Sequence, residues 1–446
     1  MDSIPLDNKN PPIRSNIKGD PYAAATSLGL MTPRSGKSAM GIKDVTGIGI
    51  GSKIHQNTHS AATPVVTDAA SDCPKRAERD PAARAATSPG ITDAFKFSQC
   101  DFSIAYYPWL FVTLGAMKSQ PSSLVDTFDR RISYLRLSVT DRCDFRCQYC
   151  MTEEMRFLPR KAVLSAEEII RLATLFVDLG VHKIRLTGGE PLVRPDIVDI
   201  AEGLSNIEGL NELVMTTNGS QLPKLAKRLV DAGVSRINVS LDTLCEKQFA
   251  ELSRTGDLTK VLAGLDAAID AGFERIRLNT VLLTGKNDTQ IELLIDYALD
   301  KGIDIAFIEE MPMGHITQTD RELSLVPSTQ VLETIRRRFN LVPIVGSSTD
   351  GPARRYSVEG TSTEVGVISP ITDNFCDACN RLRITPDGRL VLCLGHENSL
   401  DLRQMLRSDM DSSSLKRAIV AALAYKPERH VFDQPDEPQV VRLMNA

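Results

Sequence analysis

The stretch Cys143-Asp-Phe-Arg-Cys147-Gln-Tyr-Cys150 follows an alternating apolar run over residues 133–139, which predicts a β-strand leading into a cysteine loop. Three thiols at these spacings can bind three irons of an iron–sulfur cube and leave the fourth iron without a protein ligand. A structural zinc site needs four ligands, and no fourth cysteine or histidine stands near this trio. The spacing therefore favours an open iron–sulfur cluster. The alternatives are a metal-free redox set or ordinary buried cysteines.

The same residues carry a resemblance to a known family. Cys143, Cys147 and Cys150, with Tyr149 just before the last thiol, resemble the signature of the radical S-adenosylmethionine (SAM) superfamily. The resemblance implies that the open iron chelates SAM, and that an electron from the cluster cleaves SAM to a 5'-deoxyadenosyl radical. We therefore expect a [4Fe-4S] cluster and SAM as cofactors.

Composition limits the class of protein. The chain has 446 residues, of which 42% are hydrophobic and 24% charged, and this is enough for two domains with a sizeable core. The formal net charge of −5 gives no sign of nucleic-acid or membrane-surface binding. Nine cysteines, six of them in two tight clusters, favour metal ligation in a reducing compartment. The longest apolar run, near residues 104–117, is shorter than the roughly 20 residues of a membrane span.

Residues 1–120 differ from the rest of the chain. They are rich in Ser, Thr, Ala, Gly and Pro without a sustained period, so we expect a disordered N-terminal extension and assign no role to Cys73 and Cys100. Aspartates scattered through this segment are unlike a mitochondrial transit peptide. We expect a cytoplasmic protein, with the mitochondrial matrix as the alternative. Translation from Met117 is a second interpretation of the extension.

From Arg131 onward the pattern predicts alternating strands and helices. A capping box at Ser165-Ala-Glu-Glu168 begins the first predicted helix. Six strand–helix units indicate a parallel sheet with right-handed crossovers, two units short of a closed barrel. The expected strands lie near residues 133–139, 183–187, 212–217, 236–241, 275–283 and 304–309. The family resemblance implies an α/β fold, a partial (βα)6 TIM-like radical SAM barrel over residues 126–326, with a C-terminal region over 327–446.

Unusual residues stand at the carboxyl ends of these predicted strands, the edge that builds the active site in α/β barrels. Gly188-Gly-Glu-Pro191 alone is typical of a tight turn, but one unit after the cysteine loop it resembles the family's element that binds the SAM amino group. The other such residues are Thr216-Thr-Asn-Gly219, Ser240-Leu-Asp242, Asn279 and Glu310-Met-Pro312.

A second cysteine trio, Cys376, Cys379 and Cys393, is again one ligand short, and His396 could complete a zinc site. However, Cys376-Asp-Ala-Cys379-Asn-Arg-Leu-Arg383 followed by Cys393 resembles the GTP 3',8-cyclase family of molybdenum cofactor biosynthesis. That family likeness implies a second [4Fe-4S] cluster whose unique iron meets guanine. Further matching motifs are Asp126-Thr-Phe, Tyr134-Leu-Arg-Leu-Ser-Val-Thr-Asp-Arg142, Arg185-Leu-Thr-Gly-Gly-Glu-Pro-Leu-Val-Arg194 and Phe307-Ile-Glu-Glu-Met-Pro312.

The likeness also implies a reaction. The SAM-derived radical would abstract hydrogen from the ribose C3' of GTP, and C3' would then attack C8, giving (8S)-3',8-cyclo-7,8-dihydroguanosine 5'-triphosphate. The implied partners are GTP, a reductant and a downstream cyclic pyranopterin monophosphate synthase. The sequence leaves open whether the chain forms a homodimer, and we expect no nucleic acid or membrane partner.

Carried over residue by residue, the family pattern assigns roles to individual side chains. The SAM contacts would be Tyr149, Gly189, Ser240 and Met311. The GTP contacts would be Arg136, Arg185, Thr216, Arg277, Arg381 and Arg383, with Asn279 between the two ligands, and Arg136, Arg185, Arg381 and Arg383 are also the expected catalytic residues. Planar guanidinium groups suit triphosphate binding, although a single arginine is as often a solvated surface charge.

Two departures and two alternatives remain. Arg277 stands where the family usually has lysine, and the chain stops at Ala446, whereas the family typically continues into a double-glycine tail that reaches the active site. Either the chain continues further, or this form is impaired. The alternatives are another radical SAM enzyme with an auxiliary cluster and a zinc-stabilised binding protein without catalysis. Under the cyclase interpretation, we expect both cysteine trios to face one cavity.

Overall fold

The computed structural model describes residues 123–311, 324–346, 351–396 and 398–432. The chain divides into two units, Met1–Ala94 and Phe95–Ala446, and every described residue belongs to the second. The N-terminal extension expected to be disordered lies outside the described residues.

Six parallel strands form the central part of one sheet, neighbouring each other in chain order. They are β1 (Tyr134–Ser138), β2 (Lys183–Thr187), β3 (Glu212–Thr217), β4 (Arg236–Ser240), β5 (Arg275–Leu282) and β6 (Asp304–Glu309). Each predicted strand is confirmed to within a residue or so at either end. Because the six strands are parallel, their carboxyl ends lie at the same edge of the sheet. A crossover connection leads from each strand to the next.

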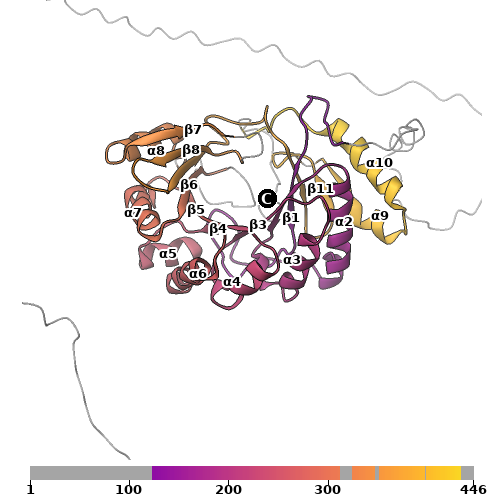
Figure 1. The fold of residues 1–446 in the computed structure, drawn as a ribbon, viewed down its shortest axis with the longest axis horizontal. Helices are drawn as coiled ribbons and strands as arrows, with labels where there is room; N and C mark the ends of the chain where they lie inside the picture. Colours follow the sequence, from indigo (N-terminus) through magenta and orange to yellow (C-terminus); the bar gives the residue numbers. More distant parts are fainter. Residues whose placement is uncertain (1–122, 312–323, 347–350, 397, 433–446) are drawn as a thin grey trace, which may run out of the picture. The chain divides into compact units, whose positions relative to one another are not determined.

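Helices connect these strands and lie around the outside of the sheet (Figure 1). They are α2 (Ala166–Asp178), α3 (Ile197–Ser205), α4 (Leu222–Asp231), α5 (Glu246–Ser253), α6 (Leu258–Ala271) and α7 (Ile291–Lys301). The predicted capping box is present, because Ser165 accepts a hydrogen bond from the Glu168 backbone and Glu168 accepts one from the Ser165 backbone. Apolar side chains such as Leu172 and Phe176 bury the inner face of α2.

The C-terminal region extends the same sheet at both edges, which the sequence did not predict. On one side β9 (Glu364–Ile368) pairs parallel with β6, followed by β8 (Arg354–Val358) and β7 (Leu341–Ile344). On the other side β10 (Arg381–Ile384) pairs parallel with β1, followed by β11 (Arg389–Val391) and β12 (Ser399–Asp401). The expected boundary near residue 326 therefore separates segments of the chain that share one sheet.

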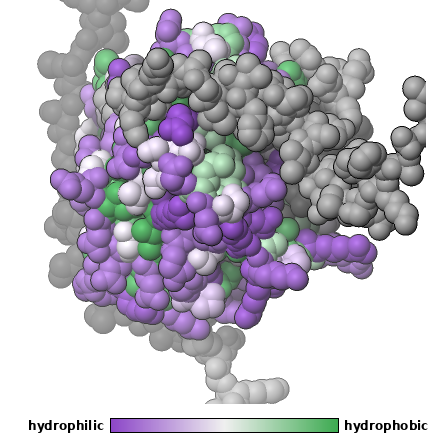
Figure 2. All heavy atoms as spheres, turned by 90° about the vertical axis from the view of Figure 1, so that its right-hand side faces the viewer, coloured by the Kyte–Doolittle hydropathy of each residue, from purple (hydrophilic) through white to green (hydrophobic). Residues whose placement is uncertain are grey.

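Three further helices belong to this region: α8 (Ser328–Arg336), α9 (Leu402–Arg407) and α10 (Ser412–Ala422). α10 packs beside α2 (Figure 1). The face that carries α2, α9 and α10 is largely hydrophilic, with apolar side chains scattered over it (Figure 2). No described helix is both long and apolar enough to cross a membrane.

Candidate active site

The first cysteine loop is fixed by backbone hydrogen bonds to the end of α5. The Arg146 amide donates to the Ser253 carbonyl over 3.0 Å, and the Gln148 amide donates to the Leu252 carbonyl over 2.9 Å. All three thiols of the loop are partly buried and free of disulfides. The loop therefore presents its cysteines from a backbone that is already held in place.

Gly188 and Gly189 pack directly against the start of this loop. The amides of Gly189 and Glu190 each donate over 2.7 Å to carbonyls of the loop, those of Thr140 and Arg142 respectively. A Cβ added to Gly189 would lie 2.4 Å from the Arg142 carbonyl oxygen, a distance that no side chain tolerates. The glycine pair is thus required by close backbone approach.

Glu190 links this turn to the end of β3, a role that the sequence analysis missed. Its buried carboxylate accepts hydrogen bonds from the Thr217 hydroxyl (2.7 Å), the Asn218 amide (2.6 Å) and the Leu192 amide (3.0 Å). Burial outweighs these bonds and raises the pKa of Glu190 to about 7. The side chain acts as a connector between two loops of the site.

The first trio lies among acidic side chains. Tyr149 donates to a buried Asp242 carboxylate over 2.7 Å. Burial, followed by nearby carboxylates such as Glu190, raises the pKa of the Cys143 thiol to about 12, and burial beside Asp242 raises that of Cys150 to about 11. Thiolates are the ligands that iron needs, so these thiols require a cation to ionise. The number and spacing of the cysteines on this loop fit an iron–sulfur cluster with one open iron.

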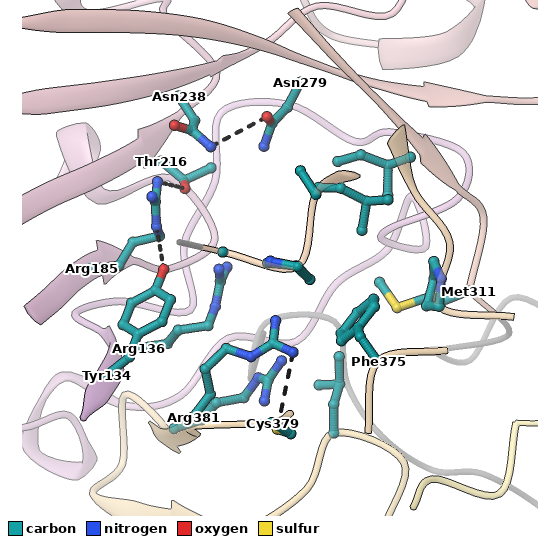
Figure 3. Close-up of a pocket in the computed structure, with 18 of the residues that line it drawn as sticks. Tyr134, Arg136, Arg185, Thr216, Asn238, Asn279, Met311, Phe375, Cys379 and Arg381 are labelled. Atoms are coloured by element: carbon teal, nitrogen blue, oxygen red, sulfur yellow. Dashed lines mark hydrogen bonds between the residues drawn. The ribbon is translucent and has the colours of Figure 1, made fainter. Parts of the chain in front are cut away.

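A cavity of about 240 Å³ is lined by strands of the sheet and by loops beside them (Figure 3). Its lining includes every residue expected to contact GTP, together with Met311 and the second cysteine trio: Arg136, Arg185, Thr216, Arg277, Asn279, Met311, Cys376, Cys379, Arg381, Arg383 and Cys393. The first trio, Tyr149, Gly189 and Ser240 are not among the lining residues. The expectation that both trios face one cavity stays a prediction.

The cavity is strongly cationic. Seven arginines and one lysine line it, and none of its described lining residues is a carboxylate. Sequence analysis missed Lys183, Arg236 and Arg355 among these cations. Lys183 could have been found, because it lies two residues before Arg185 on a strand and therefore points to the same face. Such a site suits an anion with several charges.

Three of these arginines stand side by side on neighbouring parallel strands. Arg136 on β1 lies opposite Arg383 on β10 and opposite Arg185 on β2. Burial, and then the charges of Arg136 and Arg381, lower the pKa of Arg383 to about 9. The Arg383 Nε is buried with no hydrogen-bond partner among the described residues. Buried like charges are costly unless an anion joins them.

Arg185 is aimed into the cavity by two side chains (Figure 3). Its Nε donates to the Tyr134 hydroxyl over 2.5 Å, and its Nη1 donates to the Thr216 hydroxyl over 3.2 Å. Burial by itself raises the pKa of Tyr134, but the charges of Arg185 and Arg136 outweigh it and lower this pKa to about 8. Tyr134 was quoted within a motif but not expected as a site residue.

Arg277 lies on β5 at another wall of the cavity. Burial lowers its pKa to about 10, and its nearest carboxylates, those of Asp304 and Glu364, are 3.8 and 3.7 Å away. The same two carboxylates make closer ion pairs with the adjacent Arg275. Arg277 is therefore only weakly paired and keeps hydrogen-bonding capacity for a ligand.

The second trio lies among cations. Arg381 Nη2 and Lys426 Nζ lie 4.0 and 3.7 Å from the Cys379 sulfur. Burial raises the pKa of this thiol, but Arg381 and Lys426 outweigh burial and lower it to about 6, so it ionises readily for ligation. His396 Nε2 lies 3.0 Å from the Arg429 carbonyl oxygen, and His396 does not line the cavity. The donor set fits a second cluster held by three cysteines.

Comparisons with known proteins decide the family. The Radical SAM superfamily matches residues 137–298, and Molybdenum Cofactor Synthesis C matches residues 303–432. A GTP 3',8-cyclase of Pseudomonas putida (strain W619) is 52% identical over 331 residues, covering 74% of this chain and 99% of that protein. The chain belongs to the GTP 3',8-cyclase family. A GTP 3',8-cyclase of Saccharophagus degradans is 50% identical over 327 residues, covering 73% of this chain and 98% of that protein.

Among solved structures, Streptococcus suis SuiB bound to S-adenosylmethionine is 16% identical, with a TM-score of 0.47 over 70% of this chain and 76% of that one. Membership of the GTP 3',8-cyclase family confirms the predicted fold class and the resemblance on which it was based. An iron–sulfur cluster and SAM follow from the superfamily.

Proposed function

We propose that the chain catalyses the radical SAM cyclisation of GTP to (8S)-3',8-cyclo-7,8-dihydroguanosine 5'-triphosphate, the first step of molybdenum cofactor biosynthesis. Family membership supports the reaction class. The observation that carries the location of the substrate is the row of Arg383, Arg136 and Arg185 on adjacent strands, facing a cavity lined by seven arginines. A triphosphate carries several negative charges that guanidinium groups on adjacent strands can bind together.

The first cysteine trio would hold the SAM-binding cluster, with Tyr149, Gly189, Ser240 and Met311 as the SAM contacts. When bound, the cluster and SAM supply the radical that begins the reaction. The chain positions these groups. Asp242 orients Tyr149 through their hydrogen bond, and the bare backbone of Gly189 allows the turn to approach the cysteine loop.

On this proposal, Asn279 lies between SAM and GTP. It accepts a hydrogen bond from Asn238 over 3.2 Å, and both residues line the cavity (Figure 3). Its strand neighbour in register is Ser240 on β4, one of the expected SAM contacts. This pairing supports Asn279 as the residue between SAM and GTP.

On this proposal, Arg136, Arg185, Arg277, Arg381 and Arg383 bind GTP. Thr216 also contacts the substrate and holds Arg185 in position. Planar guanidinium groups can make several directed bonds to phosphate oxygens, which fixes the ribose relative to the radical source. Phe375 and Ile308 add apolar surface to the lining of the same cavity.

The second trio would hold a second [4Fe-4S] cluster that meets the guanine base. Its three thiols share the cavity with the expected GTP residues. The zinc alternative needs a fourth ligand from His396, whose Nε2 instead lies beside the Arg429 carbonyl. We further propose a cytoplasmic enzyme that uses an external reductant and passes its product to a cyclic pyranopterin monophosphate synthase.

Anaerobic reconstitution tests the proposal. The full chain should bind about eight irons, four for each cluster. With SAM and dithionite it should form 5'-deoxyadenosine only when GTP is added, and the product should be the 3',8-cyclo nucleotide. A matched chain with Cys376, Cys379 and Cys393 changed to serine should keep about four irons and lose GTP-dependent turnover. Colourless zinc-containing protein, or equal turnover without GTP, would overturn the proposal.

A further inference from the structure

Lys426 is a buried lysine that faces the second cysteine trio. Lys426 comes after α10 in the chain, and the residue is only 3% exposed. The ammonium donates to the Leu392 carbonyl over 2.9 Å and lies 3.7 Å from the Cys379 sulfur. No described carboxylate forms an ion pair with it. A buried ammonium is costly without a negative partner, so the sulfur site is the partner that the structure offers.

Lys426 does not line the substrate cavity, unlike the other cations near these cysteines. Arg381 and Arg383 both line it, and they are expected to contact GTP. Lys426 is therefore placed to interact with the cysteines and not with the substrate. The two kinds of cation around the second trio have different tasks.

A buried ion pair at the start of the described chain holds Lys426 in this position. Arg130 Nε donates to the Asp126 carboxylate over 2.7 Å, and both residues are buried. The other nitrogens of Arg130 donate to the carbonyls of Cys376 (2.8 Å), Pro427 (2.7 Å) and Glu428 (2.6 Å). One guanidinium thus ties a cysteine of the second trio to the two residues after Lys426.

This clamp explains a motif that the substrate site leaves without a role. Asp126 belongs to the first of the matching motifs, yet neither Asp126 nor Arg130 lines the cavity. Arg130 spans 246 positions of the chain to reach Cys376 and 298 to reach Glu428. Its five donors in a rigid fork allow the four hydrogen bonds that Arg130 makes, one more than the three donors of a lysine could supply singly.

We propose that Lys426, held by the Asp126–Arg130 pair, is a positioning residue that compensates the negative charge of the second iron–sulfur cluster. The inference depends on the proposed function, because it requires a cluster on Cys376, Cys379 and Cys393. A cluster bound by three thiolates carries net negative charge, which grows on reduction. A cation a few ångströms away in a buried site stabilises the reduced form most.

The test uses the full-length chain with Cys143, Cys147 and Cys150 changed to serine, so that the measured reduction potential belongs to the second cluster alone. Lys426→Met removes the ammonium and keeps an unbranched apolar side chain that is one atom shorter. It should shift the reduction equilibrium about tenfold toward the oxidised cluster, which is ~59 mV for a one-electron couple. Lys426→Arg should restore the potential, whereas a merely structural role would not depend on charge.

Lys416→Met is the matched control. Lys416 lies on α10, and its partner is Asp178, 2.7 Å away, so its removal should leave the potential unchanged. Asp126→Asn weakens the clamp, and a chelator should then remove iron several-fold faster. If Lys426→Met fails to fold, Lys426→Gln gives the same comparison with a neutral hydrogen-bond donor.

The outcomes separate the two proposals. If the parent chain binds no iron, the second cluster of the proposed function is absent. If the parent binds about four irons and neither neutral variant shifts the reduction potential, the cluster stands and the role of Lys426 is overturned. A shift of the same size in Lys416→Met would overturn it as well.

Discussion

Arg136 on β1 and Arg383 on β10 lie directly opposite one another on adjacent parallel strands, although 247 residues separate them in the chain. The first comes directly before the segment that the Radical SAM superfamily matches, residues 137–298, and the second lies in the segment matched by Molybdenum Cofactor Synthesis C. Their pairing brings two half-buried cations together where these segments meet. The substrate cavity is therefore lined by residues from both segments.

Arg383→Met should separate stability from binding. Removing one of two adjacent, half-buried like charges should leave the free energy of unfolding unchanged or raise it, because the pKa of Arg383 is already lowered by desolvation and by Arg136. GTP affinity should fall about tenfold to a hundredfold, the effect of losing a charged hydrogen bond. Chemical denaturation and equilibrium binding of GTP measure the two effects.

Arg389→Met provides the control for that variant. Arg389 lies on β11, outside the cavity, where it bonds Ser399 and lies 3.7 Å from Asp401. Its loss should leave GTP affinity unchanged. A strong loss of stability in Arg383→Met with unchanged GTP affinity would contradict the argument.

The sequence predicted the six central strands because each is a short apolar run with a clear boundary, such as the capping box at Ser165. It also predicted five of the seven arginines that line the cavity, but only through the family likeness. It could not predict that β9 and β10 join opposite edges of the sheet, because strand pairing at long range leaves no local pattern. The contacts of Arg130 and Lys426 were hidden for the same reason.

Gly189→Ala should abolish assembly of the first site. The added Cβ would lie 2.4 Å from the Arg142 carbonyl oxygen and 2.8 Å from that of Asp141, and backbone atoms cannot move aside cheaply. We expect about half of the iron to be lost, with SAM cleavage falling at least about a hundredfold. Iron content and 5'-deoxyadenosine formation measure this.

Gly203→Ala is the matched glycine control. Its Cβ would meet only the end of the flexible Ile170 side chain, which can rotate away. Normal iron content in both variants would show that the close approach at Gly189 is not required.

The pKa of Tyr134 should report on occupation of the cavity. In the free protein, burial is outweighed by Arg185 and Arg136, and the pKa is lowered from 10.0 to about 8. A pKa lowered by folding stabilises the protein above the unfolded value and loses that contribution as the pH falls from about 10 to about 8. Tyrosinate absorbance of the wild type minus that of Tyr134→Phe gives the titration.

Adding GTP should raise this pKa, because phosphate oxygens compensate the arginines that favour tyrosinate. Inorganic triphosphate should do the same, since it carries the charges without the base. An unchanged Tyr134 titration at saturating GTP would place the phosphates away from Arg185.

Asp242→Ala should weaken SAM binding without changing GTP binding. Asp242 accepts hydrogen bonds from Tyr149 (2.7 Å) and from the Val281 amide (2.9 Å), and it does not line the GTP cavity. Losing the carboxylate frees the tyrosine that we expect beside SAM, so SAM affinity should fall about tenfold. Arg383→Met should show the reverse, weak GTP binding with normal SAM binding. Each variant serves as the other's control. General unfolding would weaken the binding of both ligands, whereas two distinct subsites predict that each variant loses affinity for one ligand only.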